Sequence, residues 1–176
     1  MHDKRIVRSI LTFSLCAVMA LPALAGRGDD ADRVSKNGRV SGTVGGVEVT
    51  IEFGRPNVKG RTIWGDLVPY KQVWRTGANE ATTITFGQNA MIQGEALSAG
   101  TYALFTIPEE GTWTVIFNKT ADQWGAFNHD ASQDALRVTV EPSAAEMVES
   151  MNFELGESTV TLRWERLAVP FEVSAK

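Results

Sequence analysis

Apolar and polar residues alternate along short segments through most of the chain, and this period of two constrains the fold more than any other feature. The clearest example is VEVTIEF at residues 47–53, which places an apolar residue at every second position. Successive side chains of a β-strand point to opposite faces, so this pattern predicts a half-buried antiparallel strand. About nine or ten such segments and almost no helical period predict an all-β domain, either a β-sandwich or a closed barrel.

Turn residues between these segments predict how neighbouring strands pair. Gly45-Gly46 predicts a hairpin joining residues 39–44 to 47–53, and Gln93-Gly94 predicts a small one. Residues 101–107 and 112–118 are predicted to form a third hairpin around Pro108-Glu109-Glu110-Gly111. Two long irregular segments, Gly54 to Thr83 and Asn118 to Asp134, depart from the alternation. One short helical turn is expected at Leu67 to Trp74 and another within Pro142 to Val148.

The first 25 residues have the composition of a secretory signal peptide. A basic start precedes an apolar run from Ile10 to Leu21, and Ala23-Leu24-Ala25 supplies a cleavage motif. The run is short of the roughly 20 residues that span a bilayer, so cleavage is expected rather than a transmembrane anchor. We therefore predict an exported protein, periplasmic or extracellular, with a flexible lead-in at residues 26–38 and a single domain at 39–176.

Loss of this leader changes both the cysteine count and the charge. The only cysteine, Cys16, lies within the leader, so the remainder has no disulfide and depends on its core for stability. Without Lys4, Arg5, Arg8 and Asp3, the remainder has 14 basic and 20 acidic side chains, a net charge of −6. This acidity argues against nucleic acid and anionic membranes as partners. The sequence gives no indication of the oligomeric state.

The segment from Gly54 to Thr83 interrupts the alternation and is the most promising place for a site. It carries five basic and two acidic side chains, a charge of +3, which leaves −9 for the rest of the exported chain. Guanidinium groups bind carboxylate or phosphate through paired hydrogen bonds, and tryptophans outside strands can stack on a planar ligand or a sugar. The candidate ligand-binding residues are Arg55, Arg61, Trp64, Trp74, Arg75, Asn79, Glu80 and Trp124.

A structural role for the same residues is the alternative. Arg75 and Glu80 could form an ion pair that ties the loop to the sheet, and the loop tryptophans could close the open end of a sandwich. Trp113 and Trp164 lie in alternating segments and are predicted to be core residues.

The residues available for catalysis are few. After the leader the chain has one histidine, His129, and no cysteine, so a His/Cys zinc set or a multi-histidine site cannot form, and we predict no metal and no cofactor. A carboxylate pair such as Asp66 and Glu80 would suit a hydrolase. The favoured function is a binding module for a small anionic or carbohydrate ligand. The alternatives are a carboxylate-dependent hydrolase and a structural or interaction protein of the cell envelope.

Several long strings also resemble a known family. RPNVKGRTIWGDLVPYKQVWRTGANEATTITF, LSAGTYALFTIP and WTVIFNKTADQWGAFNHD are similar to exported bacterial proteins grouped as domain of unknown function 2911, over roughly Asp32 to Val173. The resemblance implies a β-rich exported domain without an assigned activity. It supplies no catalytic residues to carry over.

Overall fold

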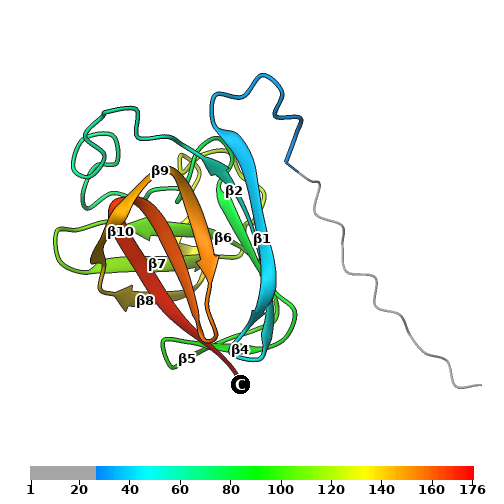
Figure 1. Cartoon of the computed structure of the whole chain (residues 1–176). Coiled ribbons are helices and arrows are strands. Elements are labelled where there is room, and N and C mark those ends of the chain that lie inside the picture. Colours follow the sequence, from blue (N-terminus) through cyan, green and yellow to red (C-terminus); the bar gives the residue numbers. More distant parts are fainter. Residues whose placement is uncertain (1–26) are drawn as a thin grey trace, which may run out of the picture.

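A computed structural model describes residues 27–176 and shows two antiparallel β-sheets that form a sandwich (Figure 1). The larger sheet has the strand order β1-β2-β3-β6-β7-β8, with bounds Lys36–Val44, Val47–Arg55, Thr82–Phe86, Gly100–Ile107, Trp113–Asn118 and Asp134–Val140. The smaller sheet has the order β5-β4-β10-β9, with bounds Glu95–Leu97, Ala90–Ile92, Thr159–Ala175 and Ser143–Leu155. The sheets do not close into a barrel. The predicted all-β class is confirmed, and the sandwich is the correct member of the predicted pair.

The three predicted hairpins are present, and their turns explain the register. Val44 pairs with Val47 across Gly45 and Gly46, which have φ angles of 55° and 80°. Positive φ at both central positions matches the right-handed twist of the strands, and glycine adopts it at low cost. Gln93 and Gly94 make the equivalent turn between β4 and β5, and β6 pairs with β7.

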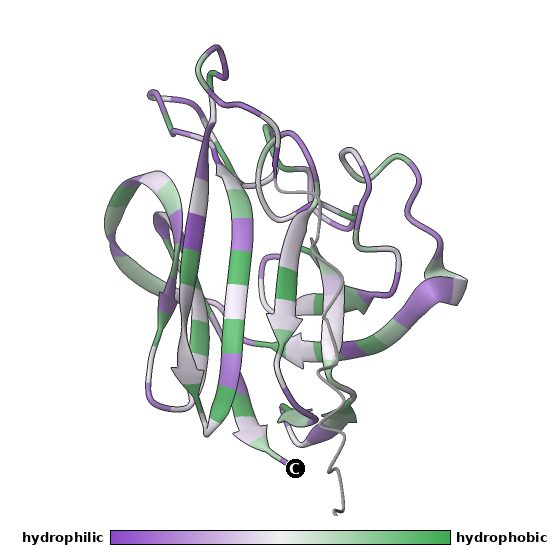
Figure 2. Cartoon of the chain, turned by 90° about the vertical axis from the view of Figure 1, so that its right-hand side faces the viewer, coloured by the Kyte–Doolittle hydropathy of each residue, from purple (hydrophilic) through white to green (hydrophobic). Residues whose placement is uncertain are grey.

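The hydrophobic core lies between the two sheets and follows the alternation of the sequence. Along the long strands, hydrophobic and hydrophilic residues alternate in bands (Figure 2). On β2, Val47, Val49, Ile51 and Phe53 are buried, whereas Glu48 between them is exposed. Each such apolar side chain contributes about 1.5–3 kcal/mol when fully buried. Trp113 and Trp164 are each 1% exposed, which confirms their predicted place in the core.

Neither of the expected helical turns is present, and both expectations were wrong. Residues 143–155 form the long strand β9, in which Ala144 pairs with Leu167 and Val148 with Glu165 of β10. Their local helix propensity is overridden because pairing with β10 satisfies the backbone along the strand. Residues 67–74 form turns without a helix. The helical element within residues 27–176 is a short 3-10 turn, η1 (Ala131–Gln133).

Two long connections meet at the end of the sandwich that lies away from the C-terminus (Figure 1). Residues 56–81 join β2 to β3, and residues 119–133 join β7 to β8. They are held together by hydrogen bonds from the Ala81 N–H to the Gln123 carbonyl (3.0 Å) and from the Gly125 N–H to the Asn79 carbonyl (3.2 Å). The irregular segments singled out in the sequence therefore share one end of the scaffold.

The N-terminal part of the chain is described only from Arg27. The predicted leader, residues 1–25, lies outside the described residues. Strand β1 begins at Lys36, three residues ahead of the segment in which a strand was expected, and residues 27–35 run along the domain before it. Within residues 27–176, no helix has the length and hydrophobicity needed to cross a membrane.

Candidate functional site

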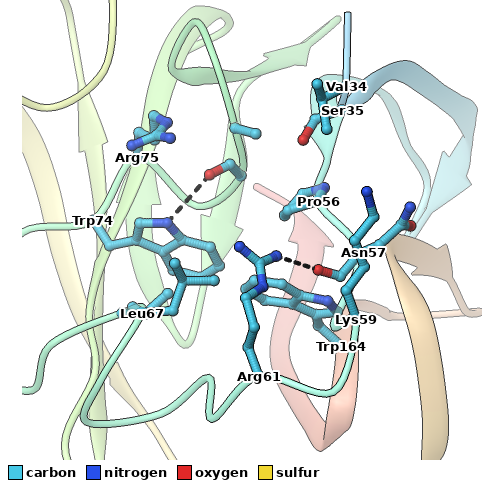
Figure 3. Close-up of a pocket in the computed structure, with 13 residues that line it drawn as sticks. Val34, Ser35, Pro56, Asn57, Lys59, Arg61, Leu67, Trp74, Arg75 and Trp164 are labelled. Carbon is cyan, nitrogen blue, oxygen red and sulfur yellow. Dashed lines mark hydrogen bonds between the residues drawn. The ribbon is translucent and has the colours of Figure 1, made fainter.

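A pocket of about 240 Å³ lies at this end of the sandwich, and three separate parts of the chain form its walls. Val34 and Ser35 come from the segment before β1, Trp164 comes from β10, and the other lining residues belong to the long connection between β2 and β3. Figure 3 shows Trp74 and Arg75 on one side of the space and Asn57, Lys59 and Trp164 on the other. Arg61 lies between these two sides in the same view.

The segment from Trp74 to Ala78 is fixed by backbone contacts with β6 and β2. Trp74 and Thr106 exchange two backbone hydrogen bonds of 2.8 and 2.9 Å, and the Trp74 indole Nε1 donates to the Gly77 carbonyl at 3.2 Å. At Gly54, an added Cβ would lie 2.1 Å from the Ala78 carbonyl oxygen, so this close approach requires glycine. Arg75 therefore projects from a rigid part of the loop.

Four tryptophans pack together beneath this loop. Trp64 lies edge-on to Trp74, Trp113 and Trp164, with ring centroids 5.9, 4.9 and 5.6 Å apart. Trp74 stacks on Trp164 at 5.8 Å with an interplanar angle of 19°. Such aromatic pairs contribute about 0.5–1.5 kcal/mol beyond the area they bury. Trp64 and Trp74 thus close the open end of the core, as one of the two sequence interpretations proposed.

The lining of the pocket is positively charged. It includes Lys59, Arg61 and Arg75 and contains no aspartate or glutamate. Arg61 donates its Nε to the Val58 carbonyl at 3.1 Å and its Nη2 to the Asn57 carbonyl, and no acidic side chain of residues 27–176 pairs with it. Glu149 accepts the backbone N–H of Lys59 at 2.8 Å but does not line the pocket.

Arg75 is the most unusual of these cations. Its side chain is half-buried, and its Nε is enclosed without a hydrogen-bond partner among residues 27–176. Burial lowers the pKa of Arg75, and no neighbouring carboxylate opposes this effect. A half-buried charge without a carboxylate partner is costly, and this sets Arg75 apart from the other cations of the lining.

The alternative ion pair between Arg75 and Glu80 is not formed, and that expectation was wrong. Glu80 instead accepts from both Nη atoms of Arg33, at 2.6 Å for Nη2, and from Arg27 Nη1 at 3.3 Å. The hydrogen bonds from Arg33 are the main cause of a lowered Glu80 pKa. We call Arg27, Arg33 and Glu80 the clamp. Its two arginines lie about 50 residues from Glu80 in sequence, so local spacing could not reveal them.

The clamp holds residues 27–35, which we call the strap, against the domain. Arg27 Nη2 also donates to the backbone carbonyls of Ala81 (2.7 Å) and Glu52 (3.1 Å). The Asn79 side-chain amide donates to the Ser35 carbonyl at 3.1 Å. Because Val34 and Ser35 belong to the strap, the clamp also fixes one wall of the pocket.

The structure brings three of the eight candidate residues into the pocket lining: Arg61, Trp74 and Arg75. The other five lie elsewhere. Arg55 donates to the Met151 carbonyl, Trp64 belongs to the aromatic cluster, and Asn79 and Glu80 hold the strap. Trp124 is 59% exposed on the second connection and bridges to Glu80 through its backbone.

Ten of the thirteen lining residues were not among the candidates, and Lys59 and Trp164 are the two of these with a charged or indole side chain. Lys59 lies in a tight turn at positive φ (49°), and its place in the basic stretch was a usable signal. Trp164 reaches the pocket although it is 1% exposed, and its indole Nε1 has no hydrogen-bond partner among residues 27–176. Its alternating position predicts a core residue and gives no indication of this second role.

Comparison with known proteins identifies the family. The family described as "Protein of unknown function (DUF2911)" matches residues 35–173, which include both sheets and nearly all of the pocket. No curated protein and no solved structure shows significant similarity to the chain. The chain therefore belongs to the DUF2911 family of proteins of unknown function.

Proposed function

We propose that this chain is a binding module for a small anionic ligand, which enters the pocket beside Arg75. The observation that carries the proposal is the state of Arg75, a half-buried guanidinium with an enclosed, unpaired Nε and no carboxylate partner among residues 27–176. Charged groups perturbed by burial in a cavity are frequent at functional sites. A carboxylate, phosphate or sulfate would supply the missing counter-charge and accept hydrogen bonds from the guanidinium.

The hydrogen-bonding groups of the lining favour an acceptor as the ligand. Lys59, Arg61 and Arg75 bring only donors to the lining, since ammonium and guanidinium groups have no acceptor. Two lining carbonyls already accept from the protein, since Asn57 binds Arg61 and Gly77 binds Trp74. The pocket thus offers donors and positive charge, which together complement an anion.

Burial of the pocket tryptophans favours an anion over a neutral carbohydrate. Trp74 is 8% exposed and Trp164 1%, so neither presents the open ring face on which a sugar would stack. The carboxylates suggested for hydrolysis are placed less favourably. Glu80 is engaged by Arg27 and Arg33, and Asp66 does not line the pocket.

The test is a binding measurement on the purified protein and on Arg75→Met. We expect acetate, phosphate or sulfate to raise the melting temperature of the native protein, because a ligand at a hundredfold excess over its Kd stabilises the folded state by about 2.7 kcal/mol. Glucose serves as the neutral comparison and should not do so.

Arg166→Gln is the matched control because it removes one positive charge from an exposed position outside the pocket. We expect this variant to respond as the native protein does and Arg75→Met to lose the response. The proposal fails if none of the anions stabilises the native protein, or if Arg75→Met binds them equally well.

A further inference from the structure

We propose that the ligand is amphiphilic, with an anionic head at Arg75 and a short aliphatic chain that lies over Val34 and Leu67. This inference rests on the proposed anion site and specifies the class of anion. It concerns the outer part of the pocket, where the lining changes from polar donors to exposed aliphatic side chains.

The aliphatic chain is inferred from two exposed side chains of the pocket lining. Five large hydrophobic side chains are strongly exposed within residues 27–176, and two of them, Val34 (80%) and Leu67 (43%), line this pocket. They come from the strap and from the long connection, two segments that the fold brings together here. Covering them with an aliphatic chain would remove apolar surface from water, worth about 25 cal/mol per Å².

The position of the anionic head is inferred from the more buried residues of the pocket lining. Arg75 is half-buried and Trp164 is 1% exposed, and both line the pocket, so they mark its inner part. Val34 and Leu67 keep much of their surface in solvent, and Figure 3 shows them on opposite sides of the space, so that one chain passing between them would contact both. An anionic head would therefore lie inside, and an attached chain would leave past the two aliphatic residues.

The size of the pocket agrees with this division. At about 240 Å³ it is smaller than the roughly 300–1000 Å³ that is usual for sites enclosing a drug-sized ligand. It suits a carboxylate or phosphate group with a few attached carbons. The rest of a longer chain would lie along the mouth rather than within the pocket.

The experiment titrates the protein with acetate, butyrate, hexanoate and octanoate by calorimetry. We expect Kd to fall about two- to fourfold for each added methylene, the upper value corresponding to about 0.8 kcal/mol per buried CH₂. Hexyl phosphate, measured beside hexanoate, shows which head binds more tightly. 1-Octanol tests the need for a charge and should bind at least tenfold more weakly than octanoate.

Two variants test where the aliphatic chain of the ligand lies. Val34→Ser and Leu67→Ser should flatten the dependence on chain length, because they remove only apolar contacts. Met147→Ser is the matched control, since Met147 is 42% exposed on β9 and lies outside the pocket. This variant should keep the native dependence.

The outcomes separate this inference from the proposed function. If none of the anions, including phosphate, binds, the anion site itself is wrong. If acetate and octanoate bind equally well, the anion site stands and the amphiphilic ligand is wrong. Equal binding of 1-octanol and octanoate, or an unchanged chain-length dependence in both serine variants, would also overturn it.

Discussion

The clamp and the pocket lie at the same end of the sandwich and both contain arginines, but they differ in how those arginines are neutralised. In the clamp, Arg27 and Arg33 share the carboxylate of Glu80. In the pocket, Arg75 has no acidic partner within residues 27–176. The charges of the clamp are balanced within the chain, whereas the charge of Arg75 would be balanced by the anion that we propose.

Arg27 and Arg75 are both half-buried, but the influences on their pKa values differ. Burial is the largest influence on both and lowers the pKa of each. For Arg27, the charge of Glu80 acts in the opposite direction, whereas Arg75 has no such compensation. The two arginines thus differ in whether a carboxylate offsets their burial, and this difference underlies the proposal of a ligand at Arg75.

The largest expected effect comes from breaking the clamp with Glu80→Ala. This change removes the carboxylate that Arg27 and Arg33 share, so we expect the free energy of unfolding to fall by about 2 kcal/mol. Losses at fully buried pairs are larger, but Glu80 keeps 23% of its side-chain surface exposed, and water screens the pair. Urea unfolding measures the change, with Glu95→Ala as an exposed control. A loss no greater than that of the control would show that the clamp contributes nothing.

Arg75→Met should weaken anion binding and leave stability almost unchanged, the reverse of what we expect for Glu80→Ala. We expect anion affinity to fall at least tenfold, about 1.4 kcal/mol, because the ligand loses a charged donor. The free energy of unfolding without ligand should stay within about 0.5 kcal/mol, since no described residue pairs with the Arg75 side chain. Calorimetry and urea unfolding of the same variant give both values. A large loss of stability would make Arg75 a structural brace like Arg27.

Lowering the pH should reduce the stabilisation that the clamp contributes. The pKa of Glu80 is lowered on folding, chiefly by hydrogen bonds from Arg33, so its contribution to stability is present above the ordinary glutamate pKa of about 4.3. That contribution is lost as the pH falls through the lower folded-state value. Unfolding measured from pH 7 to pH 3 should show the loss in the native protein and a flatter profile in Glu80→Gln. Identical profiles would contradict the assignment.

Lys59→Gln is expected to have the smallest effect. Lys59 lines the pocket but is exposed, and exposed charge interactions are usually worth about 0.2–1 kcal/mol. Anion affinity should therefore fall about twofold at low salt, and the difference should disappear as the salt concentration rises. A tenfold loss would place the head of the ligand at Lys59 rather than at Arg75.

Most of the fold could be predicted because its determinants are local. Alternation identified the strands, and glycine turns such as Gly45-Gly46 fixed which strands are adjacent. The expected helical turn at residues 142–148 failed because pairing with β10, a tertiary interaction, outweighed local propensity.

The site was less predictable because its contacts are distant in sequence. Charge and tryptophan placement pointed to the segment that supplies most of the pocket lining, including Arg61, Trp74 and Arg75. They could not show that Glu80 pairs with Arg27 and Arg33, since this pairing depends on how the strap folds back onto the domain. The same limitation hid Val34, which lies outside the candidate segment but lines the pocket.

The tryptophan cluster also gives the molecule an optical signal of its own. Indoles whose centroids lie 4.9 to 5.9 Å apart are close enough for their electronic transitions to couple, so Trp64, Trp74, Trp113 and Trp164 should absorb and emit as a set. Trp74 and Trp164 belong to this set and also line the pocket. An anion placed beside them would change the near-ultraviolet circular dichroism of all four rings. Trp124, exposed and outside the cluster, contributes a separate emission that an aqueous quencher can remove.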